Sequence, residues 1–324
     1  MILVITKPGD KHGAHMISTL KQLGEDVISF IFSDFPTINE LSFLHLGGIS
    51  DSFIRLPNGI RINTKEIKSV LYRRRDDPVA PQNIKDKRIK DYIVQETQAF
   101  LDSLPQMIDG LWVSEPATIK RADSKLYQLT IAAKLGFQTP KTLITNSPEE
   151  AEQFLKIIGD NVAIKTLHSP GVLTENQERI SLFTRQLAKN KVLPFIKRVK
   201  NCPVILQPYI DKLFELRITV VGDKVFPCAI SSQNSQRTLE DWRRYDLPNT
   251  PHKRYALPSD LEQKCVALVK TLGLMFGCID MIVTPDKKYM FLEINPNGQW
   301  LWIEQLTSLP ITQTLAELLI TGKK

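Results

Sequence analysis

The sequence predicts an α/β fold in three parts. They are an N-terminal domain over residues 1–114, a central unit over 115–200 and a C-terminal unit over 201–324. Three observations predict this organisation. The chain opens with a strand–helix–strand pattern, a second alternation of helix and strand follows residue 114, and strand patterns dominate from Val204 onward. At 324 residues the chain is also too long for one small core.

The N-terminal domain is expected to hold a parallel sheet covered by helices. Residues 2–6 (ILVIT) predict a buried strand, a helical pattern ends at Leu23 before Gly24, and residues 27–32 predict a second strand. Two strands joined by a helix form a βαβ unit, whose strands are parallel. The further elements expected here are a hairpin region over 42–64, a strand over 69–72 and a helix over 86–103.

The central unit is expected to begin with a helix over residues 123–135. Asp123 or Ser124 is its N-cap, and Gly136 is the residue that ends it. A second helix starts at Ser147, followed by Pro at the first helical position and Glu at the third, which is a capping box. The expected strands of this unit cover residues 141–145 and 161–166.

The C-terminal unit is expected to consist mainly of paired strands. The junction 221–224 (VGDK) is a hairpin signal, and residues 259–262 (SDLE) form a capping box that opens a helix. A turn at 285–286 separates two further strands, and a last helix is expected over about 311–320. The strands expected before these cover 204–210, 215–222 and 224–233.

Composition narrows the class of protein. Hydrophobic residues make up 42% and charged residues 24%, which is ordinary for a globular protein. No run of about 18 apolar residues and no signal-peptide pattern is present, so no membrane segment is expected. The four cysteines show no metal-binding spacing, and reduced thiols in a cytoplasmic protein are expected.

The net charge of +7 favours an anionic partner. The excess lies in short clusters rather than in a long basic tail, and basic residues do not alternate with aromatic ones as they do on an RNA-binding sheet. Nucleic acid is therefore not the expected partner. His12 and His15 lie three residues apart in the first helix, but without further ligands they do not predict a metal site.

A metal site is predicted near the end of the chain. Asp280, Glu293 and Asn295 lie on two strands with little more than a turn between them, and Asn297 follows directly. Two carboxylates and a carboxamide that converge in this way suit Mg²⁺, which is held by one or two carboxylates together with substrate phosphates. The chain therefore has the features of an enzyme that handles phosphate.

Two lysines and residues of two successive strands could complete a nucleotide site. Lys165 ends a buried strand (VAIK) and Lys125 lies in the first turn of a helix, although a lysine in either setting alone is more often a solvated surface residue. Glu215 and Arg217 share one face of a strand, where Arg could clamp a phosphate or the two could form an exposed ion pair. Gln207, Pro208, Tyr209 and Ile210 could pair with a purine edge through their backbone or form an ordinary edge strand.

These candidates occur in one order along the chain: Lys125, Lys165, Gln207-Pro208-Tyr209-Ile210, Glu215, Arg217, Asp280, Glu293 and Asn295. The series resembles the ATP-grasp superfamily, in which two α/β lobes grip ATP and Mg²⁺. The resemblance implies an ATP-grasp fold over about 112–300, preceded by a Rossmann-like pre-ATP-grasp domain. It also implies that the two lysines contact phosphates, that the linker holds adenine with Glu215 nearby, and that the late acidic residues and Asn295 hold the metal and nucleotide.

Three segments carry a closer resemblance: ELRITVVGDKVFPCAISSQ, LEDWRRYD and EINPNGQWLWIE. They are similar to the ribosomal-peptide ligases of microviridin (graspetide) biosynthesis, relatives of the RimK-type enzymes that add glutamate to protein termini. Such ligases cyclise a precursor peptide by joining Asp or Glu carboxylates to Ser or Thr hydroxyls as esters, or to a Lys amine as an amide. The resemblance implies a leader-bearing precursor as partner and a homodimer.

Roles for the basic residues follow from this resemblance. Lys165 and Arg217 would act on the transferred phosphoryl group, and Arg243 and Arg244 would attract acidic substrate side chains, although a solvated basic turn is the alternative. The arginines at 73–75 follow a strand, and Arg73 and Arg74 are candidates for the same task or for a solvated turn.

Two features depart from the superfamily pattern. Only Ser169-Pro170-Gly171-Val172 is available where a glycine-rich loop often covers the phosphates, and Gln207 stands where an acidic residue is common. The opening ITKPGDKHGAH does not resemble the T-x-S-x-D-N-E opening of the ester-forming branch, which favours the amide. Two other classes stay open: a glutamate-adding or small amino-acid ligase, and a nucleotide-binding regulatory protein, against which the complete metal set argues.

Overall fold

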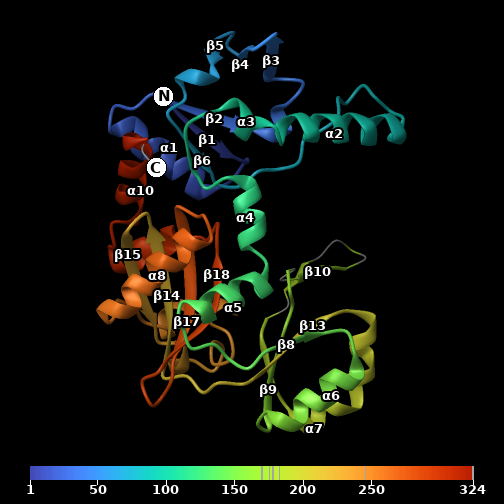
Figure 1. The fold of residues 1–324 in the computed structure, drawn as a ribbon, viewed down its shortest axis with the longest axis vertical. Coiled ribbons are helices and arrows are strands. Elements are labelled where there is room, and N and C mark those ends of the chain that lie inside the picture. Colours follow the sequence, from blue (N-terminus) through green and yellow to red (C-terminus); the bar gives the residue numbers. More distant parts are fainter. Residues whose placement is uncertain (169–170, 175, 177–178, 182, 245, 323–324) are drawn as a thin grey trace.

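The computed structural model describes residues 1–168, 171–174, 176, 179–181, 183–244 and 246–322. Three parts follow one another along the longest axis of the molecule (Figure 1). The N-terminal domain lies at one end, the C-terminal lobe lies in the middle, and the central unit lies at the other end. Helix α4 (Pro116–Ala122) leads from the N-terminal domain toward the other two parts.

The N-terminal domain contains the predicted parallel sheet. Its strand order is β2-β1-β6-β7, and all three neighbouring pairs are parallel. Helix α1 begins after Asp10, whose carboxylate caps it by accepting from the N–H of His12 at 3.2 Å. The elements are β1 (Ile2–Thr6), α1 (Lys11–Gln22), β2 (Val27–Ile31), β6 (Ser69–Tyr72), α2 (Lys87–Leu101), α3 (Leu104–Met107) and β7 (Leu111–Val113).

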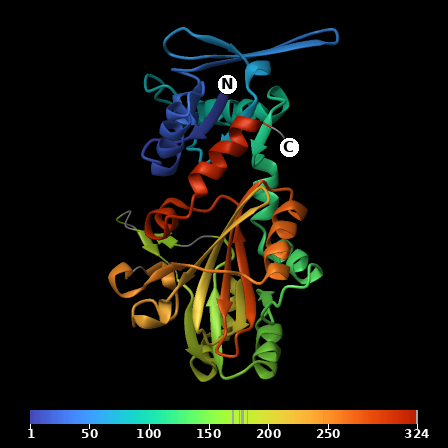
Figure 2. The same ribbon diagram turned by 90° about the vertical axis from the view of Figure 1, so that its left-hand side faces the viewer.

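The predicted hairpin region is a separate antiparallel sheet on the outer end of this domain. Its strands are β3 (Glu40–Leu46), β4 (Ile49–Arg55) and β5 (Arg61–Asn63), in the order β3-β4-β5. Figure 2 shows the β3–β4 ribbon extending across the end of the molecule. Helix α2 begins at Lys87 beside its cap residue Asp86, close to the predicted start.

The central unit is an antiparallel sheet with helices on one side. Ser124 caps α5 and Ser147 caps α6, where its hydroxyl accepts from the N–H of Glu150 at 3.3 Å. Gly136 follows α5 with φ +77°, a conformation that glycine adopts without strain. The sheet has the order β12-β9-β13-β8. The elements are β8 (Leu143–Thr145), α6 (Pro148–Ile157), β9 (Asn161–Lys165), β10 (Gly171–Leu173), β11 (Arg179–Ser181), β12 (Arg185–Ala188) and α7 (Lys189–Val192). Strand β13 (Val204–Pro208), which was expected in the C-terminal unit, lies in this sheet. Helix α5 (Lys125–Lys134), which was expected in the central unit, packs against the C-terminal lobe.

The C-terminal lobe is a five-stranded antiparallel sheet in the order β16-β15-β14-β17-β18. The hairpin predicted at 221–224 joins β14 to β15, and the turn at 285–286 joins β17 to β18. Helices α5 and α8 cover one face, while α9 and α10 pack against the other side together with the N-terminal domain. The elements are β14 (Phe214–Val221), β15 (Lys224–Ile230), β16 (His252–Arg254), α8 (Ser259–Thr271), β17 (Phe276–Val283), β18 (Tyr289–Asn295), α9 (Leu301–Thr307) and α10 (Ile311–Thr321).

The N-terminal domain and the C-terminal lobe share one hydrophobic core. Helix α10 returns to pack beside α1 and β6, and Ser69 donates to the backbone carbonyl of Leu319 at 2.6 Å. Buried Val4 and Met16 belong to the same cluster as buried Trp300. The two parts therefore stabilise each other across nearly the whole length of the chain.

Two sequence predictions need correction. Helix α8 begins at Ser259 itself, and its cap residue Pro258 makes no side-chain cap hydrogen bond, so the predicted SDLE capping box is wrong. Strand β13 is an interior strand that pairs with both β8 and β9, not an edge strand. Helices α4 and α9 were not predicted, because short segments carry too little periodicity. Within the described part of the chain, no helix is both long enough and apolar enough to cross a membrane.

Candidate functional site

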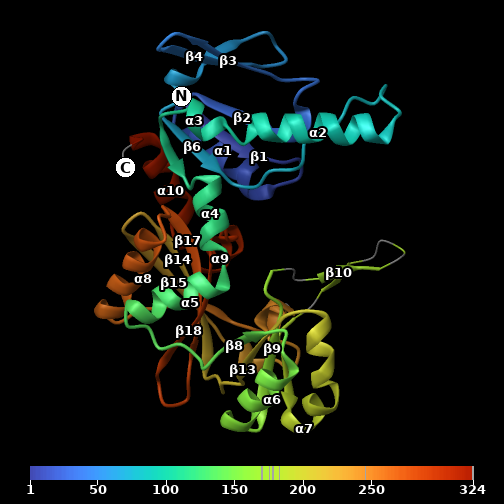
Figure 3. The same cartoon turned by 45° about the vertical axis from the view of Figure 1, so that its right-hand side comes forward.

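A polar cleft of about 250 Å³ lies between the sheet of the central unit and the sheet of the C-terminal lobe. Figure 3 shows the central unit beside and below the lobe, connected to it through α5. Of the residues that the sequence predicted for the site, the cleft is lined by Lys125, Lys165, Gln207, Pro208, Tyr209, Ile210, Glu215, Arg243, Asp280, Glu293 and Asn295. Residues from positions far apart in the chain therefore gather at one place.

The candidate metal ligands lie on two neighbouring strands, as the sequence predicted. Asp280 on β17 is the direct register partner of Glu293 on β18, and Cys278 is the partner of Asn295. Directly opposite residues of an antiparallel pair project from the same face. The two carboxylates and the carboxamide of Asn295 therefore face the cleft together.

Among the described residues, only one of the two oxygens of the Asp280 carboxylate has a hydrogen-bond partner. Its Oδ2 accepts from Arg217 Nη1 at 2.7 Å, while its Oδ1 is buried without a hydrogen-bond partner among the described residues. Burial raises the pKa of Asp280, and the charge of Arg217 opposes that shift. A buried carboxylate oxygen without a partner is costly unless it gains a cation or a donor, so this oxygen fits a metal ligand.

Glu293 is ionised by its cationic neighbours. Burial alone would raise its pKa, but Lys125 and Arg243 outweigh burial and lower the pKa of Glu293 to about 2. Lys125 Nζ lies 2.6 Å from Glu293 Oε2. No three His, Cys, Asp or Glu side chains gather into a metal-binding group in the described part of the chain. Two carboxylates and one carboxamide still fit Mg²⁺, because this ion takes its remaining ligands from water and phosphate.

Lys165 brings a positive charge to the cleft from the opposite lobe. It is the last residue of β9, where burial lowers the pKa of its ammonium and the charge of Glu293 opposes that shift. Together with Lys125 it gives the cleft two ammonium groups beside two carboxylates. Such an arrangement can accommodate both a polyphosphate and a divalent cation.

The linker after β13 lines the other side of the cleft. Gln207 is only 4% exposed, and its Nε2 donates to Thr142 Oγ1 at 2.9 Å. The N–H of Tyr209 donates to the carbonyl of Asn161 at 2.8 Å, and its hydroxyl donates to the carbonyl of Leu239 at 3.3 Å. These bonds fix the linker between the two lobes. Its pairing with a purine edge stays a prediction.

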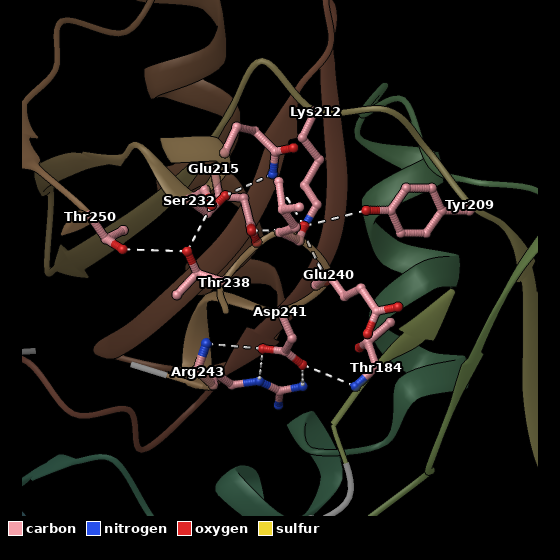
Figure 4. A network of polar contacts seen from close by, with 12 residues as sticks. Thr184, Tyr209, Lys212, Glu215, Ser232, Thr238, Glu240, Asp241, Arg243 and Thr250 are labelled. Carbon is pink, nitrogen blue, oxygen red and sulfur yellow. Dashed lines mark hydrogen bonds and ion pairs between the residues drawn. The ribbon is translucent and has the colours of Figure 1, made fainter. Parts of the chain in front are cut away.

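Two polar networks border the cleft (Figure 4). In one, Asp241 accepts two side-chain bonds from Arg243, at 2.8 and 2.6 Å, and one from the N–H of Thr184 at 3.0 Å. Burial alone would raise the pKa of Asp241, but these bonds hold it below its ordinary value. In the other, Lys212 donates to Glu215 at 2.8 Å, which opposes the rise in the pKa of Glu215 caused by burial.

Sequence reasoning did not place Lys212 or Asp241 in the site, although both line the cleft. Lys212 lies three residues before Glu215, and Asp241 lies two residues before Arg243. Such short acid–base spacings were available as signals. They become informative only when the fold shows that the acidic residue of each pair, Glu215 and Asp241, is buried.

Three predicted arginine roles change. Arg217 is 5% exposed and lies behind Asp280 outside the cleft lining, so it orients that carboxylate where direct contact with phosphate was expected. Arg73 is 1% exposed, which corrects its predicted role in binding acidic peptide groups. Arg244 pairs with Glu240 at 2.7 Å and does not line the cleft. Arg74 is exposed and also lies outside the cleft lining, and its role stays a prediction.

The phosphate-loop candidate falls partly outside the described residues. Ser169 and Pro170 are not described, whereas Gly171 and Val172 belong to β10, which pairs with β11. Of the two helix α1 histidines, His12 is buried with its ring 4.6 Å from that of Trp300, and His15 is exposed. Their side chains therefore do not share a site.

Two family models match consecutive parts of the chain and together cover nearly all of it. A model described as an MvdD pre-ATP grasp domain matches residues 1–120, and one described as a RimK-like ATP-grasp domain matches residues 122–319. The chain belongs to the RimK-like ATP-grasp family. This family consists of ligases that use ATP and Mg²⁺, so the predicted fold and cofactors are confirmed.

Solved structures carry the similarity over the whole chain. The macrocyclase MdnC of Microcystis aeruginosa, bound with precursor peptide MdnA, is 30% identical with a TM-score of 0.85, over 99% of each chain. A RiPP-associated ATP-grasp ligase of Chryseobacterium gregarium, in complex with ADP and a leader and core peptide, is 30% identical with a TM-score of 0.88, over 100% of this chain and 97% of that one. The predicted resemblance to ribosomal-peptide ligases is therefore confirmed.

A curated relative points to the wider family. A probable alpha-L-glutamate ligase of Enterobacter sp. (strain 638) is 26% identical over 212 residues. That match spans 64% of this chain and 66% of the relative. The similarity to the glutamate ligase thus covers about two thirds of this chain, whereas the similarity to the solved peptide ligases extends over nearly the whole chain, the N-terminal domain included.

Proposed function

We propose that this protein is an ATP- and Mg²⁺-dependent ligase that cyclises a ribosomally made precursor peptide of the microviridin type. In this proposal an Asp or Glu side chain of the peptide is activated as an acyl phosphate. A Lys amine, or a Ser or Thr hydroxyl, then attacks the acyl carbon, phosphate leaves, and one water is lost overall per bond formed. The opening of the sequence favours the Lys amine and hence the amide.

The observation that carries the proposal is the composition of the cleft. It combines Asp280 and Glu293 with the ammonium groups of Lys125 and Lys165, and Arg243 adds a further cation at the same place. Two ligases with 30% identity over nearly their whole length were solved with peptides bound. A carboxylate substrate needs cations beside it, because it and the phosphates of ATP repel each other.

Each residue has a task in the proposed reaction. Bound ATP supplies the γ-phosphoryl group that makes the carboxylate a good acyl donor. Asp280, Glu293 and Asn295 would hold Mg²⁺, and Lys125 and Lys165 would neutralise phosphate charge, so that catalysis rests on positioning and electrostatic stabilisation. Gln207 to Ile210 would hold the adenine.

Arg243 is the residue we assign to the substrate carboxylate. Its side chain lines the cleft, and Asp241 fixes its guanidinium through two bonds. Arg243→Gln is expected to raise the KM for the peptide about tenfold or more, because a charge-assisted bond is lost, with little change in the KM for ATP. Arg237, exposed in the same connecting segment, provides the control as Arg237→Gln. Equal effects of both variants on the two KM values would contradict the assignment.

The activity is tested by mass spectrometry of a candidate precursor incubated with this protein, ATP and Mg²⁺. The proposal expects an ATP-dependent loss of one water per ring. Mild alkali then separates the bond types, because an ester is hydrolysed and an amide persists. A precursor that stays at full mass, but gains the mass of added free glutamate, would move the protein to the second candidate function, a glutamate-adding ligase, which the curated relatives favour.

We also propose that the protein works in the cytoplasm as a homodimer. All four cysteines are free thiols, and three of them are buried, which suits a reducing compartment. The dimer follows from the family resemblance. Light scattering of the purified protein tests it, since a monomeric mass at micromolar concentration would contradict the dimer.

A further inference from the structure

Arg73 is buried at the boundary between the N-terminal domain and the C-terminal lobe. It follows β6 directly and is 1% exposed. Its Nη1 donates to both the backbone carbonyl of Asn297, at 2.7 Å, and the side-chain Oδ1 of Asn297, at 2.6 Å. Asn297 Nδ2 donates in return to the backbone carbonyls of Tyr72, at 3.3 Å, and of Arg73. Four hydrogen bonds thus join Asn297 to Tyr72 and Arg73, which lie 225 and 224 residues away in the sequence.

Asn297 belongs to the loop that follows the metal-binding strand β18. Its backbone N–H donates to Asn295 Oδ1 at 3.0 Å, and Asn295 lines the cleft beside Glu293. A carboxamide oxygen can accept two bonds, so this contact leaves one lone pair of Asn295 for a ligand while it fixes the plane of the carboxamide. The position of Asn297 therefore determines where the Asn295 oxygen points.

The same loop is packed tightly against the back of the metal site. A Cβ atom added to Gly298 would lie 2.5 Å from Cys278 Sγ and 2.8 Å from Arg217 Nη2. Trp300, which ends the loop, is 1% exposed and donates through Nε1 to Thr312 at 2.9 Å. The guanidinium of Arg73 lies 5.2 Å from the centroid of the Trp300 ring. Because both ends of the loop are held by these contacts, a change at Arg73 that displaces Asn297 is expected to displace Asn295 as well.

We propose that Arg73 is a positioning residue for the Mg²⁺ site, acting through Asn297 on the carboxamide of Asn295. It touches neither nucleotide nor metal. Through it the N-terminal domain, which supplies no residue to the cleft lining, contributes to the geometry of the metal site. Groups outside the first coordination shell commonly change metal affinity about 10- to 100-fold when they are replaced.

The test measures nucleotide binding directly. Isothermal titration calorimetry gives the affinity for ADP in the presence of Mg²⁺ and in the presence of a chelator, for the wild type and for Arg73→Met. The proposal expects about a tenfold loss of affinity for ADP with Mg²⁺ and less than about a twofold change without it. The matched control is Arg75→Met, since Arg75 bonds to Asp77 and Gln98 within the N-terminal domain and is expected to leave both affinities unchanged.

A purely structural role of Arg73, in joining the N-terminal domain to the C-terminal lobe, predicts different affinities in the same experiment. If Arg73 only holds the domains together, both affinities fall in parallel or neither falls, and either result overturns the proposal. Arg73→Lys, which keeps the buried charge and can still reach one oxygen of Asn297, carries the same test if the Met variant does not fold. Because ADP binding requires no peptide, these outcomes are independent of whether the protein cyclises a precursor.

A double-mutant cycle tests the route of the effect. Asn297→Ala removes the side-chain half of the contact and is expected to weaken ADP binding with Mg²⁺ by about the same factor as Arg73→Met. If Arg73 acts through Asn297, the double variant Arg73→Met/Asn297→Ala loses no more affinity than either single variant. Losses that multiply in the double variant would show independent action and refute the proposed route.

Discussion

Acidification from about pH 7 to about pH 5 is expected to destabilise the protein through His12. This side chain is 8% exposed on helix α1, and its ring meets the ring of Trp300 edge to face. Burial, followed by the charge of Arg73, lowers the pKa of His12 to about 4. Asp10 opposes the shift, whereas Arg74 and His15 add to it. The imidazole is thus neutral in the folded protein at both pH values.

The size of the effect follows from proton linkage. In the unfolded chain His12 takes up a proton as the pH falls below about 6.5, while in the folded chain it stays neutral until about pH 4. Its contribution to stability is therefore complete above the unfolded pKa and is lost as the pH falls toward the folded pKa. The unfolded pKa lies about 1.5 pH units above pH 5, and each unit is worth about 1.36 kcal/mol, so the loss at pH 5 is about 2 kcal/mol.

The assay compares urea unfolding of the wild type and His12→Phe at the two pH values. Phenylalanine keeps an aromatic ring against Trp300 but cannot titrate. Between pH 7 and pH 5 the wild type is expected to lose about 2 kcal/mol more stability than this variant. His45→Gln serves as control and is expected to follow the wild type, because His45 lies exposed on β3 and is not among the groups that shift the pKa of His12. Equal losses in the wild type and in His12→Phe would refute the reasoning.

Three further predictions concern the cleft and the wall behind it. Glu293→Gln or Asp280→Asn should lower turnover at least about 100-fold while circular dichroism stays unchanged, since a ligand charge is lost without a change in shape; near-normal turnover would contradict the metal assignment. Arg217→Met should destabilise the protein by about 3–5 kcal/mol in urea unfolding, because Asp280 is left buried without its partner; a loss below about 1 kcal/mol would count against a buried pair. Gly298→Ala should lower the free energy of unfolding by about 1–3 kcal/mol, because the added methyl group would lie 2.8 Å from Arg217 Nη2. Gly159→Ala should leave the free energy of unfolding nearly unchanged, because a Cβ atom there would have no atom within 4 Å. Similar effects of the two variants would refute the steric explanation.

Much of the fold could be predicted because local signals and global architecture agree. Strand β1 matches its predicted bounds, and the hairpin at 221–224 and the cap at Ser147 formed where the sequence placed them. Of the two candidates for the cap of α5, Asp123 and Ser124, the structure has Ser124. Helix α9 could not be predicted, since seven residues give a weak periodic signal. Ser259 illustrates another limit, because a motif for a helix start does not determine which residue of the motif is the cap.

The site could be predicted where its residues follow strand geometry. Asp280 and Glu293 were assigned together because a short turn between two strands brings them into register, and they are direct partners in the structure. Arg73 was misassigned for a physical reason. The sequence shows three consecutive arginines after a strand, which usually form a solvated turn, and only the tertiary fold brings Asn297 and Trp300 against one of them. Burial of a charge depends on a distant partner, which local sequence does not reveal.

The charges of the cleft pair with one another in a way that couples metal to nucleotide. Lys125 and Glu293 are partners at 2.6 Å, and each must exchange this partner for a ligand, the lysine for phosphate and the carboxylate for Mg²⁺. Mg²⁺ without phosphate would leave Lys125 beside a cation, and phosphate without Mg²⁺ would compete with Glu293 for the lysine. Bound Mg²⁺ is therefore expected to raise the affinity for ADP, and bound ADP to raise the affinity for Mg²⁺. Lys125→Met is expected to reduce this coupling, because Glu293 then has no lysine partner to lose when the metal binds. Calorimetric titration of ADP at increasing Mg²⁺ measures the coupling, and an undiminished value in Lys125→Met would show that the exchange does not involve this pair.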